Sequence, residues 1–142
     1  MVARRSVEIA YIPTLSPVLL KKCGGLRRPA DLTRYPIIQQ WDREEWNSWF
    51  RLVGASDVKF VQETTMRDSN LVIQAALDGH GVMMGSHTFL RTEFEPGRLV
   101  CPFDTELHPA KDYHLIHRPG ARARPEVEAV CAWIEAEAAS MA

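Results

Sequence analysis

The chain has 142 residues, of which 46% are hydrophobic and 25% charged, so it is long enough to bury the core of one ordinary globular domain. Its 17 lysine and arginine residues nearly balance 18 aspartate and glutamate residues, which leaves a formal net charge of −1. This balance argues against a free-standing nucleic-acid-binding domain, because such domains use a positive excess to contact phosphates.

Extended and helical patterns alternate in the first part of the chain. We expect a strand over residues 7–12, closed by Pro13, and a short helix over residues 15–22. A single helical turn at residues 29–32 and a second strand over Pro36–Gln40 follow.

The next helix carries the most complete set of signals. Asp42 can cap its start, and Glu45 is spaced to complete a capping box. Trp41 and Trp46 flank the cap at the spacing of a hydrophobic staple, so we interpret Trp41 as a packed residue rather than a ligand platform. Gly54 ends the helix, and apolar residues at i, i+3, i+4 and i+7 predict a buried stripe of Trp46, Trp49, Phe50 and Val53.

The same alternation continues through the second half of the chain. Strands are expected over residues 58–62, 81–85, 99–102 and 113–117, with a polar loop over residues 104–111. Helices are expected over residues 69–78 and 87–94, and from Pro125 onward with an apolar stripe of Val127, Val130, Cys131, Ile134 and Ala138. Strands that alternate with helices predict an α/β fold built on a mainly parallel sheet.

Cysteine usage and hydropathy indicate a cytoplasmic protein. The chain has no apolar run long enough to cross a membrane, and Glu8, Pro13 and Pro17 interrupt the apolar stretch that a signal peptide would need. The cysteines are far apart and odd in number, so no disulfide framework is expected among Cys23, Cys101 and Cys131.

The usual catalytic and cofactor motifs do not match this sequence. The run from Gly79 to Gly81 lacks the further glycines and the Lys-Ser/Thr pair of a phosphate-binding loop. His114 and His117 are three residues apart in an expected strand, so they point to opposite faces and do not suit one metal ion. No serine or cysteine sits in a nucleophile-elbow pattern. We therefore expect no enzyme activity, no metal and no cofactor.

The start of the helix at residues 69–78 has two interpretations. A helix N-terminus presents unpaired N–H groups and a partial positive charge, which can hold an anion at the carboxyl end of a sheet. Alternatively, Asp68 and Ser69 simply cap the helix.

Several motifs, in order along nearly the whole chain, resemble the effector domains of LysR-type transcriptional regulators. The run from Pro13 to Leu20 is similar to the P-x-x-S-P-x-L-L start of the family's second lobe, and residues 28–38 resemble its P-x-D-L…P-L-I segment. The tryptophan-rich helix is similar to that of the branch containing glycine-cleavage activators and β-lactamase regulators. The later matches are D-S…A-A-L-x-G-x-G-V at residues 68–82, G-R-L-V-x-P-F at residues 97–103, and the closing strand and helix.

The resemblance implies a two-lobed fold like that of type 2 periplasmic binding proteins, with a small metabolite bound between the lobes. Residues 1–112 would form the second lobe, and residues 113–142 would return to the first. The family's winged helix-turn-helix and the leading half of its first lobe have no counterpart here, so the first lobe is expected to be incomplete. DNA would be contacted only through that winged helix-turn-helix, as part of DNA-bound oligomers.

Carried over residue by residue, the resemblance places five residues against the effector. They are Gln39 and Gln40 after the second strand, Asp68 and Ser69 at the helix start, and Tyr113 near the lobe crossing. Amide, hydroxyl and phenol groups of this kind suit a polar effector that can bear a carboxylate.

Two other functions remain open at this stage. One is a solute-binding protein on the same scaffold, and the other is an interaction fragment without a ligand role. With half of the first lobe absent, the apolar stripe of the last helix would face water in a monomer, and the strand at Tyr113 would be an unprotected edge. We therefore expect self-association, as a homodimer.

Overall fold

The computed structural model describes residues 1–141, which form two compact units. One unit contains residues 10–108, and the other combines residues 1–9 with the segment that begins at Pro109. Residues 1–9 belong to the smaller unit because the first strand pairs with the strand at Tyr113.

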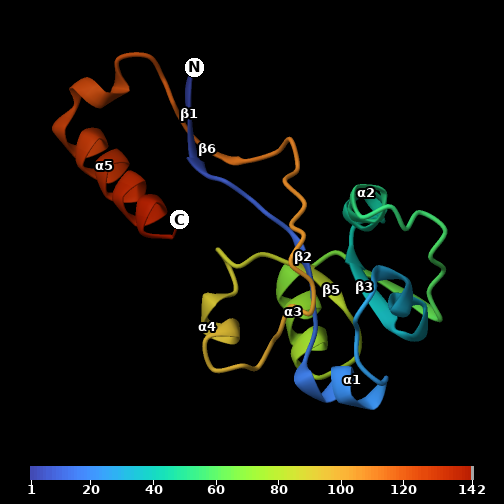
Figure 1. Cartoon of the computed structure of the whole chain (residues 1–142). Helices are drawn as coiled ribbons and strands as arrows, with labels where there is room; N and C mark the ends of the chain where they lie inside the picture. The colour runs from blue at the N-terminus through green and yellow to red at the C-terminus, as the bar shows by residue number, and fades with distance from the viewer. Residues whose placement is uncertain (142) are drawn as a thin grey trace. The chain divides into compact units, whose positions relative to one another are not determined.

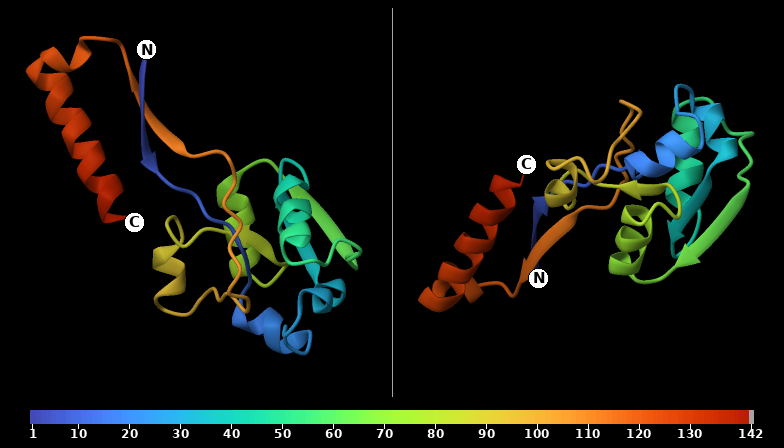
Figure 2. Two further views of the ribbon diagram at one scale, coloured as in Figure 1. Left: turned by 45° about the horizontal axis from the view of Figure 1, so that its top comes forward. Right: turned by 90° about the horizontal axis from the view of Figure 1, so that it is seen from below.

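A sheet of mixed pairing forms the centre of the larger unit (Figures 1 and 2). Strand β3 (Pro36–Gln40) pairs in parallel with β4 (Gln62–Met66), and β2 (Ile12–Thr14) pairs antiparallel with β5 (Met83–Gly85). A parallel bridge between Ile37 and Val82 joins the two pairs. The resulting order is β4–β3–β5–β2.

Helices cover both faces of this sheet because consecutive strand residues point to opposite sides. Ile37 belongs to a buried cluster with α1 (Pro17–Lys22) and α2 (Glu44–Leu52), whereas Ile38 packs with α3 (Ser69–Leu77). A 3-10 helix, η1 (Pro29–Arg34), and a short helix, α4 (Arg91–Phe94), complete the unit. This layered arrangement confirms the α/β fold class.

Some expected elements lie elsewhere in the structure. The strand expected over residues 7–12 is wrong, because residues 2–7 and 12–14 form separate strands, and Pro13 lies within the second rather than closing the first. The strand expected at residues 58–62 starts only at Gln62. Val58 and Phe60 do not pair with another strand, because they pack into the buried cluster that contains the aromatic residues of α2.

Two further elements are shorter than expected. The helix expected over residues 87–94 is reduced to α4, because the backbone oxygen of Ser86 accepts from the N–H groups of Phe89 and Leu90 in a preceding turn. The strand expected over residues 99–102 is a single bridge between Leu15 and Val100.

The aromatic stripe of α2 is buried, as predicted. Trp46, Trp49 and Phe50 are at most 2% exposed, and the indole N–H of Trp49 donates to the Thr105 carbonyl at 2.9 Å. The predicted cap at Asp42 is present, because its carboxylate accepts from the N–H of Glu44, the first residue of the helix, at 2.8 Å. The capping box is not completed, since the Asp42 N–H donates to the Gln40 carbonyl, and the predicted staple is wrong, since Trp41 is 64% exposed.

The smaller unit consists of a two-stranded ribbon and a helix. Strand β1 (Val2–Val7) pairs antiparallel with β6 (Tyr113–His117), so one edge of the expected open strand is protected by the chain's own N-terminal residues. A short 3-10 helix, η2 (Ala121–Ala123), leads into α5 (Pro125–Ser140). None of the helices described in residues 1–141 is long and apolar enough to span a membrane.

Only part of the apolar stripe of α5 is exposed to solvent, so the expectation that the stripe faces water in a monomer is partly wrong. Cys131 and Ala138 are buried, and Val127 and Ile134 are half-buried, whereas Val130 is 56% exposed. Strand β1, which the sequence reading did not predict, lies against α5.

Arg122 of η2 donates hydrogen bonds to two glutamates of α5, an arrangement that we call the arginine fork. The Arg122 guanidinium donates to Glu128 at 2.6 and 3.0 Å and to Glu135 at 2.8 and 3.2 Å, and Arg4 of β1 reaches Glu135 at 3.3 Å. These hydrogen bonds from Arg122 hold the pKa values of both carboxyl groups below the usual glutamate range. These charge-assisted hydrogen bonds hold α5 against η2 and β1.

Replacing Trp49 with alanine tests whether the α2 stripe is structural. Trp49 is fully buried, so the change leaves a large cavity and an unpaired carbonyl at Thr105. We expect Trp49→Ala to lower the free energy of unfolding by about 3–5 kcal/mol, measured by thermal and urea denaturation. Trp41→Ala is the matched control in the same unit, because Trp41 is exposed. Equal effects of the two changes would contradict a structural role.

Replacing Arg122 with glutamine tests the fork. The folded pKa values of Glu128 and Glu135 are lowered, so the fork stabilises α5 above the ordinary glutamate pKa of about 4.3 and is lost as pH falls through the lowered values. Arg122→Gln should therefore speed amide exchange along α5 at pH 7, with a difference from the parent chain that shrinks in acid.

Arg124→Gln is the control for this test, because Arg124 makes only an exposed pair with Glu126 at 3.9 Å. If both variants exchanged alike along α5, the fork would not be what holds the helix.

Candidate functional site

The carboxyl ends of β3 and β4 bring four of the five expected site residues to one edge of the sheet. The strands run parallel, with Gln39 opposite Thr65 and Gln40 opposite Met66, so both end at the same edge. Helix α3 starts three residues after β4 ends. Such an edge is where open α/β sheets bind ligands.

A hydrogen bond joins the end of β3 to the start of α3. The side-chain N–H of Gln40 donates to the Ser69 hydroxyl at 2.7 Å and, more weakly, to the backbone oxygen of Arg67 at 3.5 Å. Ser69 is exposed, and its hydroxyl group, which accepts this hydrogen bond, can still donate its proton to a ligand. We call this arrangement the Gln40–Ser69 pair.

Asp68 acts as the N-cap of α3. Its carboxylate accepts from the N–H groups of Asn70 at 2.8 Å and Leu71 at 3.3 Å. The expectation that these N–H groups are unpaired is therefore wrong, and the capping alternative is confirmed. A second anion at the same place would meet the charge of Asp68, so the helix start does not favour an anionic ligand group.

Gln39 lies at the same edge but on the opposite face from Gln40, because the two are consecutive in β3. Its side-chain N–H donates to the Thr65 hydroxyl at 3.0 Å. Its amide oxygen is buried without a hydrogen-bond partner among the described residues. An unpaired buried acceptor of this kind is costly unless another group reaches it.

Tyr113, the fifth expected residue, belongs to the smaller unit. It is the first residue of β6, opposite Val7, and is 58% exposed. Its place in the effector site remains a prediction.

Two residues at this edge were not predicted from the sequence. Trp41 directly follows β3, is exposed, and has a φ of 65°, a left-handed conformation that costs roughly 1–2 kcal/mol for a residue other than glycine. The Arg67 guanidinium lies 5.8 Å from its ring centroid. The staple spacing pointed to a packed Trp41, and no sequence signal reports its backbone angle.

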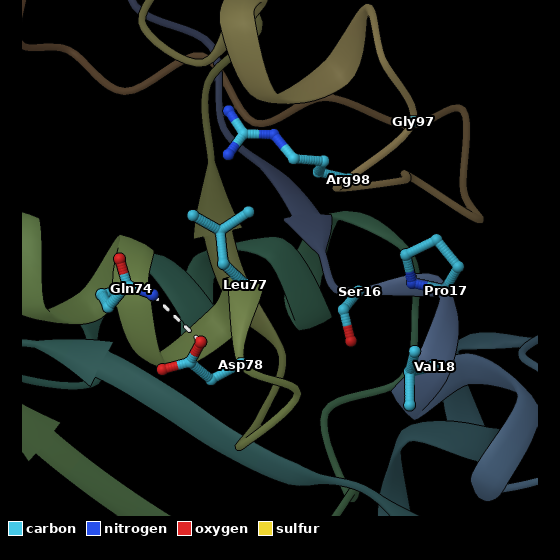
Figure 3. A pocket seen from close by; sticks show the side chains of 8 residues that line it. All are labelled: Ser16, Pro17, Val18, Gln74, Leu77, Asp78, Gly97 and Arg98. Carbon is cyan, nitrogen blue, oxygen red and sulfur yellow. Dashed lines mark hydrogen bonds between the residues drawn. The ribbon is translucent and has the colours of Figure 1, made fainter.

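A pocket of about 470 Å³ opens at the other end of α3, roughly 13 Å along the helix from Ser69 (Figure 3). Its polar groups are already engaged with the protein. Gln74 donates to Asp78 at 3.0 Å, the Ser16 hydroxyl accepts from the Leu19 N–H, and Arg98 lies 3.7 Å from Glu93. The pocket is therefore lined by polar groups that, like Gln40 and Ser69, already have partners within the protein.

The described residues offer little for metal or nucleophilic chemistry. Over residues 1–141, no three His, Cys, Asp or Glu side chains gather as a metal site. All three cysteines are free thiols, and burial raises the pKa of the Cys101 thiol.

Comparison with known proteins identifies the family. The LysR substrate binding domain family matches residues 2–139. The glycine cleavage system transcriptional activator of Escherichia coli K12 is 30% identical over 129 residues, which are 91% of this chain and 42% of that protein. The transcriptional activator AmpR of Citrobacter koseri is 28% identical over 109 residues, which are 77% of this chain and 37% of AmpR. This chain therefore spans less than half the length of these relatives.

Solved structures show the same fold. The effector domain of AmpR from Pseudomonas aeruginosa superposes with a TM-score of 0.81 at 21% identity, over 97% of this chain and 66% of that one. The AmpR effector binding domain from Citrobacter freundii gives a TM-score of 0.80 at 22% identity, over 98% and 68% of the two chains.

The fold and the family match together define the class of protein: an effector-binding domain with a periplasmic-binding-protein-like fold. The chain belongs to the LysR substrate binding domain family. The relatives named above are transcriptional regulators and not enzymes.

Proposed function

We propose that this chain senses a small polar metabolite for a LysR-type regulator and binds it at the edge formed by the ends of β3 and β4. The observation that carries the proposal is the exposed Gln40–Ser69 pair at the carboxyl ends of two parallel strands. In the whole protein, the metabolite would occupy a cleft between two lobes and control DNA-bound oligomers through a winged helix-turn-helix domain.

The proposed contacts follow from the chemistry of each group. A ligand oxygen would take the amide proton that Gln40 now gives to Ser69, and the Ser69 hydroxyl would be free to donate to it. Asp68 would hold the helix start in place through its two backbone hydrogen bonds. Gln39, whose amide oxygen is buried on the other face of β3, would support the end of that strand through its hydrogen bond to Thr65 rather than meet the ligand at this pair, and Tyr113 stays a predicted contact.

A ligand screen on single variants tests this site. We expect a polar metabolite that raises the thermal midpoint of the parent chain to bind about 2- to 10-fold more weakly to Ser69→Ala and Gln40→Ala, because each change removes a hydrogen bond. In the whole regulator, Ser69→Ala should weaken the response to effector and leave operator binding unchanged.

Gln74→Ala is the matched control, since Gln74 is also an amide on the α3 side but lines the pocket at the other end of the helix. If Gln74→Ala weakened binding while Ser69→Ala did not, the pocket would be the ligand site and the proposal would fail.

A second proposal is that the chain forms a homodimer through its smaller unit. Val130 and Trp133 lie three residues apart on one side of α5 and are 56% and 64% exposed, and Ile116 of β6 is 55% exposed. Exposed tryptophan beside aliphatic residues is typical of protein interfaces.

Sedimentation equilibrium at micromolar concentration tests the homodimer. We expect the parent chain to have twice its monomer mass of 16.1 kDa, and Trp133→Glu to shift it to monomer, because a charge would be buried in the interface. Ala139→Glu places the same charge on the opposite side of the exposed helix and should leave the dimer intact. A monomeric parent chain would refute the proposal.

A further inference from the structure

Trp41 has a left-handed backbone conformation in the turn that follows β3, although it is a large side chain. It is the one residue other than glycine with positive φ among residues 1–141, and its side chain is 64% exposed. A bulky residue in this conformation gains no core packing in return for its backbone strain. Strain of this kind gathers at functional sites, where the surrounding structure maintains it.

The backbone around Trp41 fixes its position at the ligand edge. Its N–H donates to the Met66 carbonyl at 3.0 Å, which continues the β3–β4 ladder by one residue. On its two sides, Gln40 donates to Ser69, and the Asp42 N–H donates to the Gln40 carbonyl at 2.8 Å. The backbone of Trp41 is thus fixed next to Gln40, and its ring contacts Arg67, whose backbone oxygen accepts weakly from the Gln40 side chain.

Arg67 lies against this ring and keeps its charge available. Its guanidinium carbon is 5.8 Å from the Trp41 ring centroid, within cation–π range. None of the salt bridges between described residues includes Arg67, which is exposed. The pair therefore offers an aromatic surface and an adjoining cation to a bound molecule.

We propose that Trp41 and Arg67 form a stacking platform that selects effectors carrying a flat conjugated ring with an attached anionic group. The ring stacks on the indole of Trp41, and the anion pairs with Arg67. This inference rests on the proposed function, because the platform adjoins the Gln40–Ser69 pair, and it adds the chemical class of the ligand. It also assigns the anionic group of the ligand to Arg67. The start of α3 is not assigned this role, because the Asp68 carboxylate already accepts from two N–H groups there.

The surroundings of the platform favour a small ligand over a protein partner. Interface hot spots built on tryptophan and arginine lie in well-packed apolar centres. The residues on either side of this platform in sequence are polar: Gln40, Asp42 and Asp68. Polar groups beside an aromatic ring can fix the orientation of a small bound molecule.

Three matched probes test the platform: benzoate, cyclohexanecarboxylate and benzamide. Cyclohexanecarboxylate keeps the charge without the aromatic ring, and benzamide keeps the ring without the charge. Binding is followed by two-dimensional NMR, with the Trp41 indole signal assigned by its loss in Trp41→Gly. We expect benzoate to bind about 2- to 10-fold more tightly than either other probe and to shift the Trp41 indole and Ser69 amide signals.

Two variants separate the ring from the charge. Trp41→Gly should abolish the preference for benzoate over cyclohexanecarboxylate, and Arg67→Gln should abolish the preference for benzoate over benzamide. Arg51→Gln is the control for the charge, because it removes an exposed arginine side chain elsewhere in the larger unit. Equal affinities for the three probes, or preferences unchanged in the two variants, would overturn the platform.

The thermal midpoint separates ligand recognition from a structural role. Glycine adopts a φ of 65° without strain, so Trp41→Gly should not lower the midpoint. A fall as large as that of Trp49→Ala would show that Trp41 is structural, and a change in sedimentation mass would show a protein interface; either result overturns the platform.

The same variants distinguish the platform from the site beside it. If metabolites found in the screen depend on Ser69 but not on Trp41, the proposed function stands and the platform fails. If they depend on neither residue, both proposals fail.

Discussion

The parallel pairing of β3 with β4 is the constraint on which the proposed ligand site depends. Five successive residue pairs, from Pro36–Gln62 to Gln40–Met66, bring two chain segments to the same edge and leave their next residues side by side. Gln40 can then reach Ser69, and the Trp41 N–H can reach the Met66 carbonyl. A register shift of one residue would turn Gln40 to the other face and separate these groups. The two core clusters, which use Ile37 and Ile38 on opposite faces, stabilise this register.

The charges at this edge define what it can bind. Asp68 satisfies two N–H groups of α3, so the helix start already holds one carboxylate and does not invite a second. Arg67, the residue before Asp68, has no ion pair among the described residues and lies against the exposed ring of Trp41. A ligand that is polar where it meets Ser69 and anionic where it meets Arg67 fits both observations. This division of roles follows from the geometry of side chains close in sequence.

The sequence predicted those helices whose ends or buried face are marked by residues within the helix or next to it. Helix α3 was predicted from Asp68 and Gly79, and α2 from its buried aromatic stripe, because capping and periodicity act within a few residues. Strand β1 was missed since it has no apolar pattern and becomes a strand only by pairing with β6, more than a hundred residues away in the chain. The residues expected at the ends of β3 and β4 lie there, and their role in binding stays a prediction. The choice between capping and anion binding at Asp68, and the exposure of Trp41, depend on backbone angles that sequence patterns do not report.

A crystal structure of the chain with its bound effector tests the central claim most directly, because it locates the ligand without relying on variants. The account predicts ligand polar atoms about 3 Å from the Gln40 amide nitrogen and the Ser69 hydroxyl, with the hydrogen bond between those two residues replaced by bonds to the ligand. A ligand found instead against Ser16, Gln74 and Asp78, with the Gln40–Ser69 hydrogen bond intact, would contradict it.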